Sequence, residues 1–372
     1  MTKRLPARPR VVAGLPVLRR KAGELQIGLD PRHATVVDGL SDRVVAAAGR
    51  FTGDRTTDEL TADLDDEDRD QLTELVGRLH ERGFLEDATP LPASLAGELS
   101  ASRVRTLGTG LPPHDHPIGR TDLAVAVQGD GRLATAVGCL LAAAGVGWVH
   151  VAATGTVHPE DTGAGYRPDD VGVPRLVAAR RALRRAEPNV RTTHFDASRA
   201  PDLVVLTDAL VPRPEHVDML MRAAVPHLLV RVRDTVGIVG PLVVPGLTSC
   251  LRCADLHRCD RDPCWPQLAV QLVGRTQLTD LAGTQATAAF AAAQVLEAAA
   301  WLRGAPARPA TCETSVAVEP RTATVRHRAW SPHPRCPCGA ARRRQDGVVP
   351  WAESAAHTAP ELRQSNRDGD AS

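Results

Sequence analysis

Short apolar runs separated by helix-like stretches constrain the fold of this chain more than any other feature. Each run has four or five residues, mostly Val, Leu and Ala, which is typical of a parallel strand buried on both faces. Helices are predicted between them over 176–185 and 216–224. This alternation predicts a doubly wound α/β sheet with right-handed crossovers. The runs lie at 123–127, 149–153, 203–206 and 228–232.

The first run leads into a glycine-rich turn. Gly129, Gly131 and Ala134 give the pattern Gly-x-Gly-x-x-Ala, and an Ala/Leu-rich helix follows. The first glycine permits a tight turn, the second lets a phosphate approach the backbone, and the small third residue allows close helix–strand packing. The helix N-terminus adds N–H donors that favour an anion. The turn can also serve packing alone, so nucleotide-type geometry and nucleotide binding are separate predictions.

Two close pairs of cysteines lie far apart in the chain. Cys250 and Cys253 form Cys-x-x-Cys, and Cys336 and Cys338 form Cys-x-Cys. Each spacing lets a tight turn present two thiolates to one ion, and four thiolates complete a tetrahedral structural zinc site. Such a site has no position for water, so it would tie the C-terminal segment to the main domain. The alternatives are four unrelated free cysteines, or a redox Cys-x-x-Cys pair.

The other four cysteines have less specific surroundings. Cys259 and Cys264 follow the first pair closely, beside arginines. Either is a candidate thioester nucleophile with a pKa lowered by a neighbouring arginine, or a spare, partly buried thiol. Cys139, on a helix face, and Cys312 are expected in the core.

The first 90 residues predict a small winged-helix-like α+β unit. A hairpin is expected around Lys21 and Gly23, followed by an apolar helical stretch at 44–48 and a capped helix start at Thr56. A third helix has apolar residues at 72, 75, 76 and 79, with Gly83 as its C-terminal cap and a short strand after it. Such a unit is a peptide-docking module, in which an extended leader peptide adds to a sheet edge, or a stabilising appendage. An acidic run at 63–70 disfavours DNA binding, although it equally fits a solvated helix entry.

These patterns divide the chain into four segments. They are the winged-helix-like unit (1–90), a proline-containing linker (91–119), an α/β domain (120–340) and a polar, disordered tail (341–372). An alanine-rich helix at 284–301 is apolar enough to be a core helix or a dimer interface.

Charge and hydropathy exclude two classes of partner. With 45 basic and 44 acidic residues, the formal charge of +1 provides no field for nucleic acid or anionic lipid. No apolar run reaches about 18 residues and no signal-peptide core follows the N-terminus, so we expect a cytoplasmic protein without membrane segments. Disulfides are not expected in that compartment. Lysine occurs only at positions 3 and 21, so a reaction that needs a lysine in the main domain has no candidate.

Taken in order, these elements resemble the ThiF/MoeB family of ubiquitin-like-modifier-activating proteins over roughly 120–340. The resemblance rests on the glycine turn, a strand ending in Thr207-Asp208, the segment Pro-Gly-Leu-Thr-Ser-Cys-Leu-Arg-Cys at 245–253, and the late Cys-x-Cys. It implies a Rossmann-like sheet of ThiF type, a homodimer, and ATP- and Mg²⁺-dependent adenylation of the C-terminal carboxylate of a peptide or a ubiquitin-like sulfur-carrier protein. The N-terminal unit resembles the leader-peptide recognition element of ThiF-like partners of a cyclodehydratase, which present a precursor peptide rather than consume ATP.

Several positions depart from the active pattern of that family. Ala153 and Gly155 stand where the pattern has aspartates, and Ala164 stands where it has an arginine. The first aspartate should hold the ribose and the arginine should stabilise the transferring phosphates, and losing one such donor costs about a hundredfold to a thousandfold in rate. Arg175 replaces the lysine of the family and keeps a charge for phosphate. Asp208 matches the metal-binding aspartate, although strand-end aspartates also cap turns.

The sequence therefore predicts a ThiF-type protein that binds a precursor peptide or a small protein, with weakened ATP chemistry. The alternative is an active adenylyltransferase that uses Arg175 for phosphate and Asp208 for Mg²⁺. A nicotinamide enzyme is disfavoured, because the second strand ends at 152–154 without an acidic residue for the ribose.

Overall fold

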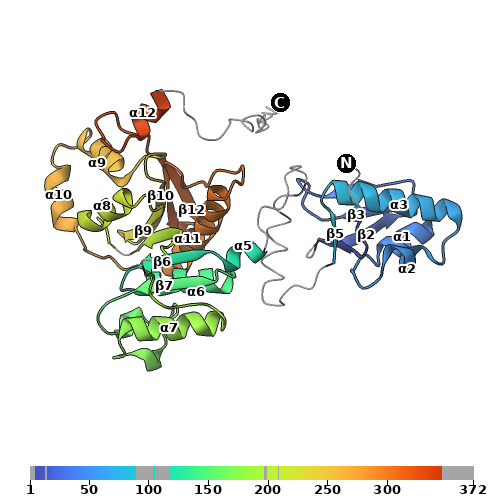
Figure 1. Cartoon of the computed structure of the whole chain (residues 1–372), viewed down its shortest axis with the longest axis horizontal. Helices are drawn as coiled ribbons and strands as arrows, with labels where there is room; N and C mark the ends of the chain where they lie inside the picture. Colours follow the sequence, from blue (N-terminus) through green and yellow to red (C-terminus); the bar gives the residue numbers. More distant parts are fainter. Residues whose placement is uncertain are drawn as a thin grey trace, which may run out of the picture.

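The computed structural model describes residues 5–12, 15–88, 104, 107, 117–196, 199–207 and 209–345. Figure 1 shows an N-terminal unit, in blue, and a larger α/β domain, in green to red. Each has its own hydrophobic core. The expected linker lies mostly outside the described residues, but its Leu107 is buried in the N-terminal core. That part of the segment therefore belongs to the N-terminal unit.

The N-terminal unit contains two small antiparallel sheets. The predicted hairpin is present as β2 and β3, joined by a turn in which Gly23 has a φ of 73°. β4 pairs with the other side of β3, and β1 pairs with β5, the short strand expected after Gly83. Strands β1 and β4 were not predicted, because three residues give no readable alternation. The strands are β1 (Pro9–Val11), β2 (Val17–Lys21), β3 (Glu24–Ile27), β4 (Thr35–Val37) and β5 (Leu85–Asp87).

One helix of the N-terminal unit, α2, begins at the capped start predicted for it. The Thr56 hydroxyl accepts from the Glu59 N–H, and the Glu59 carboxylate accepts from the Thr56 N–H, which completes a capping box. The acidic run opens α3, with Asp65 as its N-cap, so it serves as a solvated helix entry. The apolar face of α3 is buried as predicted, while the winged-helix comparison stays a prediction. The helices are α1 (Asp42–Ala48), α2 (Thr57–Thr61) and α3 (Asp66–Glu81).

A seven-stranded sheet with the order β12-β11-β10-β9-β8-β6-β7 forms the centre of the main domain. Strands β6 to β9 are parallel and match the four apolar runs to within one residue. Strands β10 to β12 are antiparallel, so the sheet is mixed, and these three strands were not among the predicted runs. β10 carries two glycines and a proline, and β12 is exposed and polar, so neither gives an apolar run. The strands are β6 (Ala124–Gln128), β7 (Trp148–Ala152), β8 (Leu203–Leu206), β9 (His227–Arg233), β10 (Val236–Val243), β11 (Thr314–Glu319) and β12 (Thr324–Ala329).

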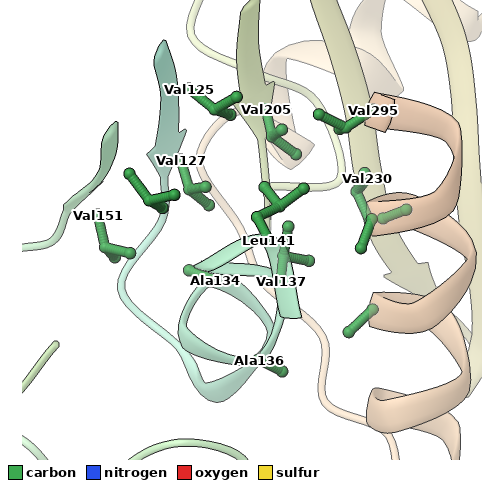
Figure 2. Packing of buried hydrophobic residues seen from close by; sticks show 14 of the residues in the cluster. Val125, Val127, Ala134, Ala136, Val137, Leu141, Val151, Val205, Val230 and Val295 are labelled. Carbon is green, nitrogen blue, oxygen red and sulfur yellow. The ribbon is translucent and has the colours of Figure 1, made fainter. Parts of the chain in front are cut away.

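Helices cover both faces of this sheet. Val127 points to the face covered by α6, α7 and α11, where it shares a core with Val295 (Figure 2), and Ala126 points to the face covered by α8 and α9. α6 approaches the sheet closely, since a Cβ at Gly138 would lie 2.9 Å from Cγ2 of Val151. The predicted helices correspond to α7, α8 and α11, and α11 is a core helix. The helices are α6 (Arg132–Ala143), α7 (Arg175–Ala186), α8 (Pro214–Arg222), α9 (Leu251–Cys259), α10 (Trp265–Leu272) and α11 (Leu281–Leu302).

Short helices occur at both ends of the domain. α12 (Ala340–Gln345) crosses the expected boundary at 341, so helical structure continues into the segment that we expected as a tail, while 346–372 lie outside the described residues. Of the helices in the described ranges, none combines the length and the hydropathy that a membrane crossing needs. The remaining short helices are α5 (Pro117–Thr121) and the 3₁₀ turns η1 (Pro159–Asp161), η2 (Pro168–Asp170) and η3 (Pro320–Thr322).

Candidate functional site

Four cysteine sulfurs meet where α9 begins and where the segment after β12 turns into α12. Cys250 is the N-cap residue of α9 and Cys253 lies in its first turn. Cys336 and Cys338 lie between β12 and α12. The start of α9 is fixed from the other side by Thr248, whose buried hydroxyl accepts the backbone N–H four residues earlier at 2.8 Å. The predicted convergence of the two distant pairs is confirmed.

The spacing of these sulfurs fits a tetrahedral metal ion. Sγ of Cys250 lies 3.8 Å from that of Cys253 and 3.6 Å from that of Cys336, and Sγ of Cys253 lies 3.6 Å from that of Cys338. A tetrahedron with metal–sulfur bonds of about 2.3 Å has sulfur–sulfur edges of about 3.8 Å. All four thiols are free, and three of the residues are buried. This cluster therefore has the donor set and the spacing to hold one soft metal ion.

Crowding changes the acidity of these thiols. Hydrogen bonds with the Cys253 and Cys338 thiols raise the pKa of Cys250, and burial adds to this. Hydrogen bonds from Cys250 and Cys253 instead lower the pKa of Cys338, because they stabilise its thiolate. Cys338 is therefore the sulfur of this group whose thiolate, the form that binds a metal, is favoured.

A polar group beside the sulfurs was missed by the sequence reasoning. Nε2 of His333 lies 2.8 Å from Oδ2 of Asp260, and Arg335 pairs with the same carboxylate. The His257 and His333 rings lie 4.8 Å apart, and Nε2 of His257 lies 3.0 Å from the carbonyl oxygen of Ser331. The hydrogen bond with His333 lowers the pKa of Asp260. This group ties α9 to the C-terminal segment a second time, and the one signal for it is the i, i+3 spacing of His257 and Asp260 on α9.

At the other end of the parallel strands, the glycine turn has the predicted strand–turn–helix geometry. Gly129 donates its N–H to the last residue of β7 at 3.2 Å, Gly131 is the N-cap residue of α6, and Ala134 is fully buried. The Asp130 carboxylate, between the glycines, accepts the N–H and the hydroxyl of Thr154. These bonds join the ends of β6 and β7 and place a negative charge in the turn.

Arg175, the predicted phosphate residue, opens α7 and is bonded within the protein. Its Nη2 and Nε lie 2.8 and 3.0 Å from Oδ2 of Asp161, and its Nη1 donates to the Thr154 carbonyl at 3.1 Å. The side chains of the pair are 16% and 6% exposed, so the pairing is largely buried. Phosphate binding by Arg175 stays a prediction. Asp208, the predicted metal residue, lies outside the described residues.

The remaining cysteines lie apart from the sulfur cluster. Burial raises the pKa of Cys139 and Cys312 to about 11 each, which suits the expected core thiols. Cys259 ends α9 and is partly buried, and Cys264 is exposed before α10. A nucleophilic role for either stays a prediction.

Comparison with solved structures identifies the fold. No family model and no curated protein sequence matches the chain. The structure is similar to that of E. coli MccB with MccA-N7isoASN, with a TM-score of 0.62 and 15% identity, covering 89% of this chain and 99% of that one. It is similar to E. coli MccB with ATP, with a TM-score of 0.60 and 16% identity over 89% and 99% of the two chains. The structure of PaaA gives a TM-score of 0.61 and 16% identity over 85% and 98%.

These similarities show that the chain has a ThiF/MoeB-type fold. At this level of identity they concern the fold alone. The predicted α/β sheet of ThiF type is thereby confirmed.

Proposed function

We propose that this protein, which has a ThiF/MoeB-type fold, binds a precursor peptide or small protein in a peptide-modification pathway, with weakened ATP chemistry. The observation that carries the proposal is that the structural similarity to MccB extends beyond the α/β domain into the N-terminal unit. Residues 120–340 are 221 of 372, whereas the likeness to MccB with MccA-N7isoASN covers 89% of the chain. MccB, a microcin C7 biosynthetic enzyme, has also been captured with N-formylated MccA and with ATP. A bound substrate therefore accompanies this two-part architecture in the similar structure.

The bonding of the glycine turn supports weakened ATP chemistry. Asp130 places a carboxylate beside the helix N-terminus that would receive phosphate, and like charges repel. Arg175 already neutralises Asp161, so a phosphate would have to compete with a buried carboxylate. The positions where an active member has two aspartates and an arginine hold Ala153, Gly155 and Ala164.

The edge of β2 supports peptide docking. β2 pairs with β3 alone within the described sheet, and four of its five residues are exposed. The hydrogen bond from Gly28 N–H to the Pro16 carbonyl places residues 16 and 18 on the β3 side. In an antiparallel pair the alternate residues, Val17 and Arg19, then direct their N–H and C=O groups outward. An extended peptide can add there as a further strand.

Fluorescence anisotropy of labelled peptides encoded beside this gene tests the docking. Arg19→Pro removes an outward N–H and should weaken binding by about tenfold or more, since several main-chain bonds depend on a continuous edge. Arg19→Ala is the matched control, because it removes the same side chain and keeps the N–H. Equal binding by the proline and alanine variants would refute docking at this edge.

Zinc in the sulfur cluster, a homodimer, a cyclodehydratase partner and a cytoplasmic location belong to the same proposal. Four thiolates at tetrahedral spacing are the donor set that zinc takes in structural sites. In that role Cys250, Cys253, Cys336 and Cys338 would hold the C-terminal segment against α9, with no position left for water.

The second candidate function is an active adenylyltransferase that acts on the C-terminal carboxylate of a peptide or a sulfur-carrier protein. The strand–turn–helix geometry around Gly129 and Gly131 favours it. ATP–pyrophosphate exchange with candidate peptides separates the two functions. Sustained exchange that Asp208→Ala abolishes would establish the second, whereas absence of exchange beside tight peptide binding supports the first.

A further inference from the structure

A cavity lined by arginines lies at the end of β9, on the face of the sheet that α8 and α9 cover. Its volume is about 450 Å³, too large for a lone phosphate ion and sufficient for a few amino-acid residues. Apolar and aromatic groups line it beside the charges. The lining residues that matter are Leu210, Arg231, Arg233, Arg258, Arg261, Trp265, Leu272 and Arg328, together with Asp234 and Asp262.

Arg231 is the innermost of these arginines. It is 6% exposed, on a strand whose neighbouring side chains are core residues. In the part of the chain that the structure describes, no hydrogen bond or ion pair joins its guanidinium group to another residue, and the side chain lines the cavity. A buried charge without a partner is costly, so proteins seldom retain one unless something else compensates it.

Contact with the Trp330 ring positions three of the other four guanidinium groups. Arg258, Arg328 and Arg261 lie 4.6, 4.4 and 5.7 Å from the centre of the Trp330 ring. Trp330 is 3% exposed and anchored by its Nε1, which donates to the Ser315 hydroxyl at 2.9 Å. These guanidinium groups are therefore held in place before any ligand binds, which reduces the conformational entropy that is lost on binding.

The charge around the cavity is unbalanced. Five arginines face two lining carboxylates, and a third, Asp255, is bonded to Arg258 at 2.7 Å. Burial lowers the pKa of Arg231 to about 9, and repulsion from Arg258 and Arg233 adds to this. Among the described residues, five arginines therefore face three carboxylates, and an anionic ligand would reduce this excess of positive charge.

We propose that this cavity binds a peptide segment that carries closely spaced carboxylates, through Arg231 with Arg258 and Arg328. The planar guanidinium fork matches a carboxylate with two parallel hydrogen bonds. Leu210, Leu272 and Trp265 fit the carbon skeleton of such side chains, which a free phosphate lacks. This inference rests on the proposed peptide-binding function and adds the chemistry of the segment that reaches the main domain.

Titration of the full chain with N-acetyl-triglutamate amide tests the proposal. Tryptophan fluorescence and calorimetry measure the binding. Triglutamate should bind at least about tenfold more tightly than triglutamine, because charge-assisted hydrogen bonds are lost in the amide. Inorganic phosphate and pyrophosphate are titrated in parallel. Tighter binding of either one than of triglutamate would overturn the carboxylate-peptide assignment.

Arg231→Met tests the role of the buried charge, and Arg252→Met, an exposed arginine on α9, is its matched control. Arg231→Met should weaken triglutamate binding by about tenfold or more and raise the melting temperature, because it removes a buried charge that has no ion-pair partner among the described residues, at nearly constant volume. A lower melting temperature with unchanged triglutamate binding would assign Arg231 a structural role and overturn the proposal.

A second variant covers the case in which Arg231→Met fails to fold. Arg328→Met changes an exposed residue and should weaken triglutamate binding severalfold, and unchanged binding there would also overturn the proposal. The Arg231 and Arg328 variants assign triglutamate binding to this cavity. Absence of triglutamate binding together with Arg19-dependent peptide binding would therefore reject this inference and leave the proposed function standing.

Discussion

The sulfur cluster and the glycine turn both begin a helix at the end of a strand, but their polar groups are occupied differently. Around the sulfurs, four thiol donors from two distant segments face one another at the spacing of a single ion. Around the glycines, Asp130 is bonded to Thr154 and Arg175 to Asp161, so the charged side chains have partners from the protein. Donors that converge at metal spacing indicate an external ligand, whereas internally paired charges indicate a structural use of the motif.

Removal of the metal from the sulfur cluster should have the largest effect. Structural zinc contributes about 10 to 16 kcal/mol of apparent binding energy, which is comparable to the stability of a whole domain. We expect a chelator or Cys253→Ser to lower the melting temperature strongly and to abolish the metal content measured by mass spectrometry. Cys264→Ser, at an exposed cysteine, is the control. If the reduced protein contains no metal and its melting temperature does not change with a chelator, the sulfur cluster is not a metal site and its contrast with the glycine turn is wrong.

Arg175→Ala should destabilise the turn by about 3 kcal/mol, because it leaves the buried Asp161 carboxylate unpaired. The loss is measured by denaturant unfolding. In the double variant with Asp161→Ala the cost should be smaller than the sum of the two single changes. If Arg175→Ala leaves stability unchanged and only lowers affinity for ATP, Arg175 is a ligand residue and the turn resembles the sulfur cluster after all.

Asp130→Ala should cost about 1 kcal/mol, since it removes partly exposed hydrogen bonds to Thr154. The same change removes the carboxylate from the phosphate position, so any affinity for ATP should rise. Equilibrium dialysis with ATP beside denaturant unfolding checks both effects. Asp169→Ala, on a neighbouring exposed turn, is the control. A fall in ATP affinity would contradict the idea that Asp130 blocks phosphate.

Mild acid should have the smallest effect, through His150 on β7. Burial lowers the pKa of His150, so its folded pKa lies below the ordinary value of 6.5. The unfolded state then binds more protons below about pH 6.5, and stability should fall as the pH drops from about 7 to 5. His150→Gln should reduce this slope in thermal unfolding, whereas His216→Gln, at an exposed histidine, should not. If stability changes equally with pH in the two variants, His150 is not the group responsible for the loss of stability in mild acid.

The parallel half of the sheet and the sulfur cluster were predictable from the sequence for physical reasons. Buried parallel strands need apolar side chains on both faces, so their runs are continuous, and thiolate pairs at metal spacing have few other uses. The antiparallel half was not predictable, because β12 lies at an edge and its exposed residues include Arg326 and Arg328. The pairing of Arg175 with Asp161 was also hidden, since ionic partners 14 residues apart meet only through the path of the intervening loop.

The separation of the two sulfur pairs along the chain sets the order of events during synthesis. The pairs are 86 and 85 residues apart, and the second pair follows the last strand of the sheet. On a ribosome the first pair emerges and must wait, reduced and without its partners, until β11 and β12 have been made. The four sulfurs can therefore meet only after all strands of the sheet have been synthesised. A product truncated before Cys336 would carry two of the four ligands and could not form the site.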